Sequence, residues 1–217
     1  YFTEPRFDEK SYQSFMSRMA GMLENKAASP EAAFQDTMSV TMANYHERAR
    51  PMTKELLQEA DFKRIQQIGK ERFRNAADFK FFFVGNINID EFKPLIEKYI
   101  GGIPSMMEKE NWVDLGIEKP EGVIEKVVKR GEEEKSIQYI VFHGEFDYNS
   151  QNQVQLDAVG RILTTRLLEV IREDKSSVYS INASTSSSKF PDEEYSITVA
   201  YGTSPEKLYE LKKSVFD

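Results

Sequence analysis

The sequence predicts an α+β fold, a mixed, mostly antiparallel sheet with helices packed on one face. Three observations lead to this prediction. Residues 1–75 repeat apolar side chains at steps of three and four, the spacing of amphipathic helices. The later part alternates apolar and polar residues in segments separated by helical patterns. The chain has 217 residues, 40% hydrophobic and 12% aromatic, which is enough to form a core.

The first predicted elements are helices. Residues 8–26 carry an apolar stripe, which predicts a helix that faces the core. Ser29 and Pro30 then supply an N-cap and a proline at the first helical position, so a second helix begins there. Thr53 is a suitable cap for a third helix, which we expect to be bent or broken near Asp61.

A strand, another helix and a connector follow. Residues 78–84 are almost continuous phenylalanine and valine, which predicts a strand covered on both faces. Asn88, with Glu91 three positions later, predicts a capping box and a helix. Residues 106–121 carry scattered charge and the single tryptophan without either periodicity. We therefore expect an irregular connector there, which acts as a hinge or as a link between two lobes.

Alternating segments dominate the rest of the chain. Residues 123–128 and 136–143 alternate on the two sides of a charged turn, which predicts an antiparallel hairpin. We expect the remaining elements in the order helix, strand, strand and helix, at residues 151–173, 177–186, 194–201 and from 204 onward.

These patterns also suggest how the chain is divided. Residues 1–50 are predicted to be a helical segment that continues from a preceding domain or leads into the domain that follows in this chain. Residues 51–217 are predicted to form an α/β domain that contains the connector 106–121. Because the chain begins with tyrosine and its last helical pattern is interrupted, we expect it to be a piece of a longer polypeptide.

Composition excludes several classes of function. The formal charge of -7 and the absence of a run of lysine and arginine argue against nucleic-acid binding, which needs clustered positive charge. The longest apolar run is far shorter than the roughly 20 residues of a membrane span. The chain has no cysteine, so it has neither disulfides nor thiolate metal sites. The expected partners are therefore peptides or other proteins.

An arginine and a tyrosine stand on the two sides of a predicted helix-to-strand turn. Arg172 lies at the end of the 151–173 helix, and Tyr179 lies near the start of the next strand. A fixed guanidinium and a phenol can both donate hydrogen bonds to a peptide carbonyl and to charge that develops on it. From the residues alone a structural role is the simpler interpretation, because the helix dipole favours arginine at a C-terminus and tyrosine suits strands.

Several short sequences occur in a specific order. They read K-A-A-S-P-E-A-A-F at 26–34, F-F-V-G-N at 82–86, L-I-E-K-Y-I-G at 95–101, I-P-S at 103–105 and I-R-E at 171–173, followed by Y-S at 179–180. Together they resemble the C-terminal, non-metal-binding half of the bacterial pitrilysin/insulinase-type zinc metallopeptidases, the inverzincins. The arginine and tyrosine of that family's L-R-E-x-x-x-x-x-Y-x-V signature correspond to Arg172 and Tyr179.

The resemblance implies a fold and a division of labour. In the family, two similar halves of two α/β domains each enclose a chamber, and residues 51–217 resemble a C-terminal-type domain. The N-terminal half carries H-x-x-E-H and a downstream glutamate, which hold zinc and activate water. The resemblance therefore implies that Arg172 and Tyr179 bind a peptide or unfolded-protein substrate opposite the N-terminal half of the same polypeptide. It also implies a periplasmic location, by similarity to bacterial members.

The chain departs from the family in one respect. Zinc catalysis needs three protein ligands around an open position, and the chain holds only His46 and His143, neither within an H-x-x-E-H motif. Zinc is therefore expected in the absent N-terminal half. We predict that the isolated chain has no catalytic residues of its own and is not an active peptidase.

Other interpretations stay open at this point. The chain is alternatively a non-catalytic scaffold or subunit of the same fold, or a peptide-binding module with only fold-level similarity to peptidases. His143, Glu145 and Asp147 alternate at a strand end and could place metal ligands on one face, although such polar residues usually face solvent. The polar residues 184–188 suit an edge strand that pairs with an extended peptide.

Overall fold

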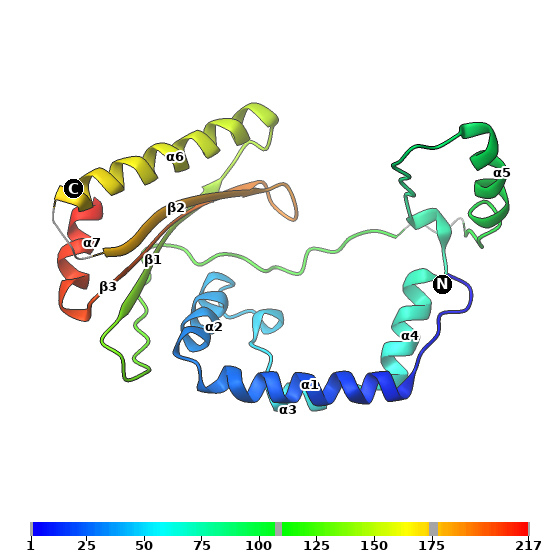
Figure 1. The fold of residues 1–217 in the computed structure, drawn as a ribbon, viewed down its shortest axis with the longest axis horizontal. Helices are drawn as coiled ribbons and strands as arrows, with labels where there is room; N and C mark the ends of the chain where they lie inside the picture. The colour runs from blue at the N-terminus through cyan, green and yellow to red at the C-terminus, as the bar shows by residue number, and fades with distance from the viewer. Residues whose placement is uncertain (1, 107–109, 174–177, 217) are drawn as a thin grey trace. The chain divides into compact units, whose positions relative to one another are not determined.

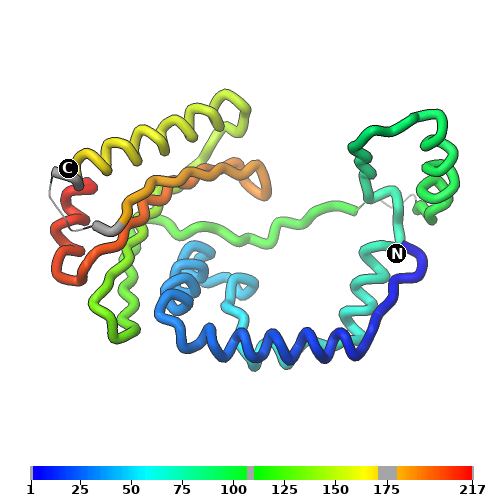
Figure 2. The backbone as a smooth tube through the Cα atoms, viewed as in Figure 1, coloured from blue at the N-terminus to red at the C-terminus, as the bar shows by residue number. Residues whose placement is uncertain are grey.

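The structure, a computed structural model, describes residues 2–106, 110–173 and 178–216. The backbone forms two compact units, Tyr1–Gly131 and Glu132–Asp217. Figure 1 labels their helices and strands, and Figure 2 traces the same backbone as a tube. In its described residues the first unit contains helices and irregular segments but no strand, whereas the second combines helices with a small sheet.

The α-helices of the first unit each begin at a side chain that accepts a hydrogen bond from a nearby backbone N–H. Such caps satisfy donors that the first turn of a helix leaves unpaired. The predicted caps Ser29, Thr53 and Asn88 are confirmed, and Asp61 starts a new helix where a bend or break was expected. The helices are α1 (Glu9–Ala28), α2 (Pro30–Met42), α3 (Lys54–Gln58), α4 (Phe62–Phe73) and α5 (Ile89–Tyr99).

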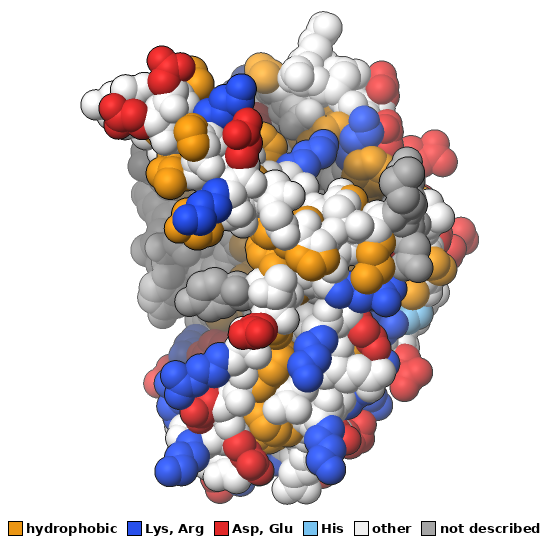
Figure 3. All heavy atoms as spheres, turned by 90° about the vertical axis from the view of Figure 1, so that its right-hand side faces the viewer, with side chains coloured by type: hydrophobic (Ala, Val, Ile, Leu, Met, Phe, Trp, Pro, Cys, Tyr) orange, Lys and Arg blue, Asp and Glu red, His pale blue; other side chains and the backbone are white. Residues whose placement is uncertain are grey.

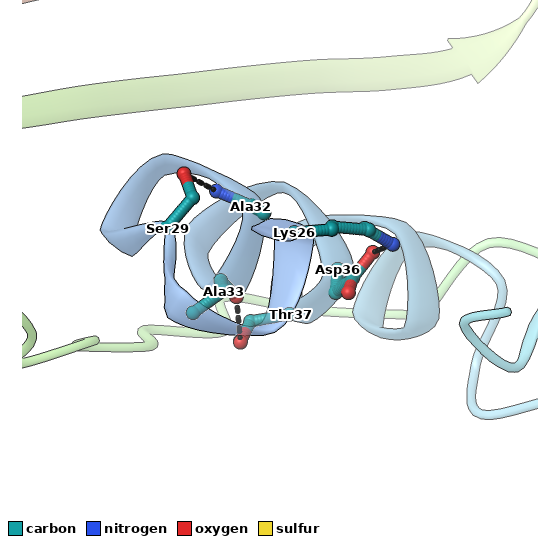
Figure 4. A network of polar contacts seen from close by, with 6 residues as sticks. All are labelled: Lys26, Ser29, Ala32, Ala33, Asp36 and Thr37. Carbon is teal, nitrogen blue, oxygen red and sulfur yellow. Dashed lines mark hydrogen bonds and ion pairs between the residues drawn. The ribbon is translucent and has the colours of Figure 1, made fainter. Parts of the chain in front are cut away.

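The turn between α1 and α2 is fixed by polar contacts. Ser29 Oγ accepts a hydrogen bond from Ala32 N at 3.2 Å and so caps α2. Lys26 Nζ lies 2.7 Å from Asp36 Oδ1 and joins the end of α1 to α2 (Figure 4). Because Ser29 is the only residue between the two helices, this cap and this ion pair determine how the chain leaves α1 and enters α2.

Residues 79–84 are extended but belong to no sheet, so the predicted buried strand is wrong. Phe82 is 84% exposed, although Phe79 packs against Phe2 with ring centroids 5.0 Å apart. A strand needs a neighbour that receives its backbone hydrogen bonds. Within the described residues, none hydrogen-bonds to the backbone of residues 80–87. An apolar run indicates a tendency to be buried and does not identify the neighbour.

Residues 110–135 contain neither helix nor strand. The predicted hairpin is therefore wrong in its first strand, since residues 123–128 do not pair with the strand that follows. Val123 is 95% exposed and Trp112 is 67% exposed. Hydrophobic side chains also reach the surface among lysines and acids on the face drawn in Figure 3. In its described residues the predicted connector is irregular, as expected, and the irregular backbone continues beyond residue 121 to residue 135.

The second unit contains an antiparallel sheet with strand order β1-β3-β2. The strand β3 lies in the centre, so Tyr201 is paired with Gln138 on one side and with Ile181 on the other. This confirms an α+β fold with an antiparallel sheet. The elements are β1 (Ser136–Glu145), α6 (Ser150–Glu173), β2 (Val178–Ser188), β3 (Glu194–Thr203) and α7 (Leu208–Phe216).

The core of the second unit lies between the sheet and its two helices. Leu167 of α6 and Leu211 of α7 pack on the same apolar cluster of the strands, so both helices cover one face of the sheet, as predicted. Burial of this cluster removes apolar surface from water, which is the main favourable contribution to folding. Its buried members are Leu167, Ile181, Ala183, Val199, Tyr201 and Leu211.

Tyr201 makes the stability of this unit sensitive to high pH. Its side chain is 2% exposed, its hydroxyl donates a 2.7 Å hydrogen bond to Gln138 Oε1, and burial raises its pKa to about 12. In the unfolded chain the phenol loses its proton near pH 10. The stability contributed by the buried, protonated tyrosine is thus complete below pH 10 and is lost as the pH rises from about 10 to 12.

We therefore expect the wild-type chain to lose on the order of 2 kcal/mol more unfolding free energy between pH 9 and 12 than the Tyr201→Phe variant does. Denaturant titrations followed by circular dichroism measure this difference. Tyr209→Phe is the matched control, because Tyr209 is 85% exposed. Equal pH dependence in wild type and Tyr201→Phe would contradict the assignment.

Candidate functional site

The predicted site residues lie where α6 ends and β2 begins. Arg172 belongs to the last turn of α6, and Tyr179 is the second residue of β2. Their side chains, like residues 174–177 between them, lie outside the described part of the structure. The prediction that both side chains bind substrate therefore stays a prediction, and the described residues define the framework that holds the two positions.

A threonine joins α6 to the edge of β2. Ala183 N donates a 3.0 Å hydrogen bond to Thr164 Oγ1, and the same hydroxyl lies 3.2 Å from Ala183 O and 2.9 Å from Gly160 O. In the register with β3, Ala183 stands opposite Val199, and Thr164 Oγ1 satisfies the backbone N–H of Ala183. One hydroxyl thus links the middle of the helix to the middle of the strand.

Gly160 permits this close approach. A Cβ atom at Gly160 would lie 2.8 Å from Thr185 Cγ2 and 3.5 Å from Ala183 O. Thr185 is also held by α6 itself, because its Oγ1 donates a 3.2 Å hydrogen bond to Asp157 Oδ1, one turn before Gly160. The absence of a side chain at Gly160 therefore sets the distance between α6 and β2.

The two elements run in opposite directions, which places the backbones of Arg172 and Tyr179 at the same end of the pair. The contacts pair Thr164 with Ala183 and, further back along the helix, Asp157 with Thr185. From Thr164 to Arg172 the helix rises about 12 Å at 1.5 Å per residue. From Ala183 back to Tyr179 the strand covers about 13 Å at 3.3 Å per residue. The two backbone positions are therefore level with each other along the α6–β2 pair.

Sequence reasoning did not identify the residues that build this framework. Thr164, Gly160 and Asp157 lie inside a helical pattern in which only the apolar stripe was considered. The one available signal was Gly160, because a glycine inside a helix costs stability and commonly marks close packing. The partner strand of Thr164 could not be found from a spacing rule.

The possible metal ligands at the end of β1 do not form a site. No group of three histidine or acidic side chains with metal-binding geometry occurs among the described residues. Asp147 instead accepts a 3.1 Å hydrogen bond from Asn149 Nδ2, and His143 and Glu145 stand opposite Ser196 and Glu194 in the sheet register. Asp147 therefore belongs to the turn that leads into α6, whereas His143 and Glu145 belong to β1.

The edge of β2 is partly occupied. The polar residues 184–188 were predicted to suit pairing with an extended peptide, yet the adjoining Ala183 already bonds Thr164 and the Thr185 hydroxyl bonds Asp157. A strand that adds here must avoid or displace α6. The hypothesis of peptide pairing along this edge stays untested, and the α6 contacts restrict it to the part of β2 beyond Thr185.

Comparisons with solved structures show what the fold is similar to. The periplasmic protease PqqL from Escherichia coli matches with a TM-score of 0.84 and 19% identity, over 97% of this chain and 23% of that one. The ferredoxin protease FusC, solved as a point mutant in complex with Arabidopsis ferredoxin, matches with a TM-score of 0.77 and 15% identity. That match covers 99% of this chain and 23% of FusC. No curated protein matches the sequence.

The fold is thus that of an α+β domain found within larger proteases. Residues 61–217 also match the family model described as "Peptidase M16 inactive domain", and the chain belongs to this family. The resemblance to the C-terminal, non-metal-binding half of pitrilysin-type metallopeptidases is confirmed. The chain spans about a quarter of the length of the two solved structures. In its described residues, no helix is both long and apolar enough to cross a membrane.

Proposed function

We propose that the chain is the C-terminal, metal-free part of a zinc-dependent metalloendopeptidase and that it contributes substrate-binding residues to a site completed by an N-terminal half. The proposal rests on the family match over residues 61–217 and on the α6–β2 framework, which holds the backbones of Arg172 and Tyr179 at one end. The expected substrates are peptides or unfolded proteins. The expected partner is the N-terminal half of the same polypeptide.

The residues of this chain do not fit a zinc site of their own. Its two histidines, His46 and His143, lie in different units, and the described residues contain no group of three ligands. Zinc and the base that activates water accordingly belong to the proposed N-terminal half. The role left to this chain is to bind and orient the peptide, which positions the scissile bond.

Within this role, Arg172 and Tyr179 act as hydrogen-bond donors. A guanidinium offers up to five N–H donors and a phenol offers one O–H, and both can reach a peptide carbonyl oxygen. When that carbonyl becomes tetrahedral its oxygen gains negative charge, so donors that point at it are worth more in the transition state than in the bound substrate. We propose that Tyr179 donates to this oxygen and that Arg172 holds the neighbouring backbone of the substrate.

Hydrolysis of an unstructured fluorogenic peptide library tests the division of labour. We expect no hydrolysis by the 217-residue chain with or without added Zn²⁺, and hydrolysis by the full-length parent that a chelator abolishes and Zn²⁺ restores. Zinc-dependent cleavage by the isolated chain would overturn the assignment of catalysis to the other half. Circular dichroism of both proteins controls for folding.

The matched family model describes an inactive domain, so the match by itself does not separate the first proposal from a second candidate. The parent is then a non-catalytic scaffold or subunit with the same fold. A parent that lacks H-x-x-E-H and hydrolyses nothing in the same assay, while it still binds an unfolded protein, would support the scaffold.

We also propose a periplasmic location, because the fold is similar to that of the periplasmic protease PqqL. Fractionation of cells that express the parent tests this location.

A further inference from the structure

The connector between the two units is attached to the first unit at defined points. Glu110 Oε1 lies 3.0 Å from Arg72 Nη1 of α4. Lys126 Nζ lies 5.4 Å from the centroid of the Tyr45 ring. The backbone of Gly131 passes Pro30 so closely that a Cβ at Gly131 would lie 3.0 Å from Pro30 Cγ. The connector is therefore irregular without being free along its length.

The position of Tyr45, the residue that Lys126 contacts, is fixed by the backbone that follows α2. After α2 ends at Met42, Asn44 and Tyr45 both have left-handed backbone angles, with φ of 48° and 59°. Such angles are unfavourable for residues other than glycine and occur where the surroundings hold them. Here Tyr45 N donates a 2.8 Å hydrogen bond to Val40 O, and the phenol lies 3.5 Å from Thr41 Oγ1. The ring is thus anchored to α2.

The Lys126–Tyr45 contact has two favourable components. An ammonium near an aromatic ring is attracted by the negative face of the ring. The hydrogen bond from Lys126, with a smaller contribution from Thr41, lowers the pKa of the Tyr45 phenol, because both favour its charged form. Each component is modest at an exposed site, so the contact fixes the connector only together with the second attachment at Pro30.

The two attachments lie at opposite ends of α2. Pro30 is its first residue and Tyr45 follows its last turn, about 20 Å away at 1.5 Å per residue. Residues 126–131 span about 17 Å when extended. Because Lys126 contacts the far end and Gly131 the near end, this part of the connector runs beside α2 in the opposite direction. The span of residues 126–131 matches the distance between Pro30 and Tyr45 once the length of the Lys126 side chain is added.

The left-handed backbone at Gly131 marks where this path ends. Its φ of 89° is accessible to glycine and strained for other residues, and Pro30 occupies the space of a side chain. Immediately afterwards the chain turns, with Lys135 N donating to Glu133 O at 2.8 Å, and β1 begins at Ser136. The division into compact units also falls between Gly131 and Glu132.

We infer that residues 126–131 form a latch along α2, held by Tyr45 and Pro30, and that residues 132–135 are the swivel between the two units. This moves the hinge away from residues 106–121, where the sequence pattern had suggested it. The second unit carries both Arg172 and Tyr179, so a change at the latch alters the freedom of both together. The inference does not depend on the proposed peptidase function and holds equally for a scaffold.

The chain contains no cysteine, so thiol-reactive spin labels attach only to cysteines that are introduced. A pair of introduced cysteines therefore places two labels at chosen positions. We choose Ser39→Cys on the surface of α2 and Val127→Cys, which is 81% exposed, and measure the distance distribution by pulsed electron paramagnetic resonance. A narrow distribution is expected, and Lys126→Met should widen it at least twofold. The matched control Lys129→Met, on the same exposed segment, should leave it unchanged.

A second pair separates the latch from the swivel. With labels at Ser39→Cys and Tyr209→Cys, one in each unit, Lys126→Met should widen the distribution further than Lys129→Met does. A broad Ser39–Val127 distribution in wild type, or one that Lys126→Met leaves unchanged, would overturn the latch. If Lys126→Met widens the Ser39–Val127 distribution but not the Ser39–Tyr209 distribution, the proposed link between latch and swivel is overturned. Circular dichroism confirms that each variant keeps its helices.

Discussion

Replacement of Leu211 by alanine is expected to lower the free energy of unfolding of the second unit by about 2–5 kcal/mol, the range for a buried leucine in a packed core. Leu211 is 2% exposed and is the buried residue by which α7 packs on the core cluster. An isolated helix as short as Leu208–Phe216 is unstable in water, so packing must hold it in place. Loss of Leu211 therefore weakens the attachment of the whole helix.

Chemical denaturation and amide hydrogen exchange measure this effect together. Exchange in α7 should rise more than exchange in β3, which retains neighbours on both sides. Tyr209→Ala is the matched control in the same helix, since Tyr209 is 85% exposed and its loss should change stability by less than about 0.5 kcal/mol. Equal effects of the two substitutions would show that α7 is not held by Leu211.

Replacement of Gly160 by valine is expected to destabilise the second unit by about 1–3 kcal/mol, the usual cost of forcing extra atoms into a packed contact. The first added carbon would lie 2.8 Å from Thr185 Cγ2. Thr185 is stiff because it is β-branched, and its hydroxyl is bonded to Asp157, so it cannot turn aside without loss of that bond. The strand must move away from α6 instead.

Gly21→Val in α1 provides the comparison for this substitution. A Cβ at Gly21 meets no other residue within 4 Å, so the change should be neutral or stabilising by about a few tenths of a kcal/mol, since valine is the better helix former. In the proposed parent peptidase Gly160→Val should also lower kcat/KM, because it displaces the framework that holds the backbones of Arg172 and Tyr179. A stable Gly160→Val variant with unchanged activity would show that α6–β2 spacing does not matter.

The sequence predicted those elements whose signals are local. Helix starts at Ser29, Thr53 and Asn88 depend on one side chain and the backbone next to it, and the structure confirms all three. The strands of the second unit were also found, because alternation continues over β2 and β3 and both are covered on one face. Fold class followed from the order of these elements.

The predictions that failed required knowledge of a distant neighbour. Residues 79–84 and 123–128 have the composition of strands, yet neither forms a strand in the described part of the structure. The second segment leads instead into a path along α2, through contacts of Lys126 and Gly131 that no periodicity encodes. Composition specifies how apolar a segment is, and long-range packing decides where it lies.

The candidate site also combines features with a local sequence signal and features that depend on distant neighbours. Arg172 and Tyr179 were selected through the resemblance, and from the residues alone their positions suggested structural roles. The framework that sets their backbones level, Thr164 with Ala183 and Gly160 with Thr185, depends on a helix and a strand that are far apart in sequence. Neither contact could be derived from spacing within one element.

The most direct test of the central proposal is kcat/KM for peptide hydrolysis by the full-length parent and its Tyr179→Phe variant. The substitution removes one hydroxyl, and Tyr195→Phe, on the central strand β3, is the control for loss of a phenol elsewhere. If Tyr179 donates to the developing oxyanion, kcat/KM should fall on the order of tenfold to a thousandfold, mainly through kcat, while the protein stays folded. An active parent that Tyr179→Phe leaves unchanged would contradict the proposed role of this chain in the active site.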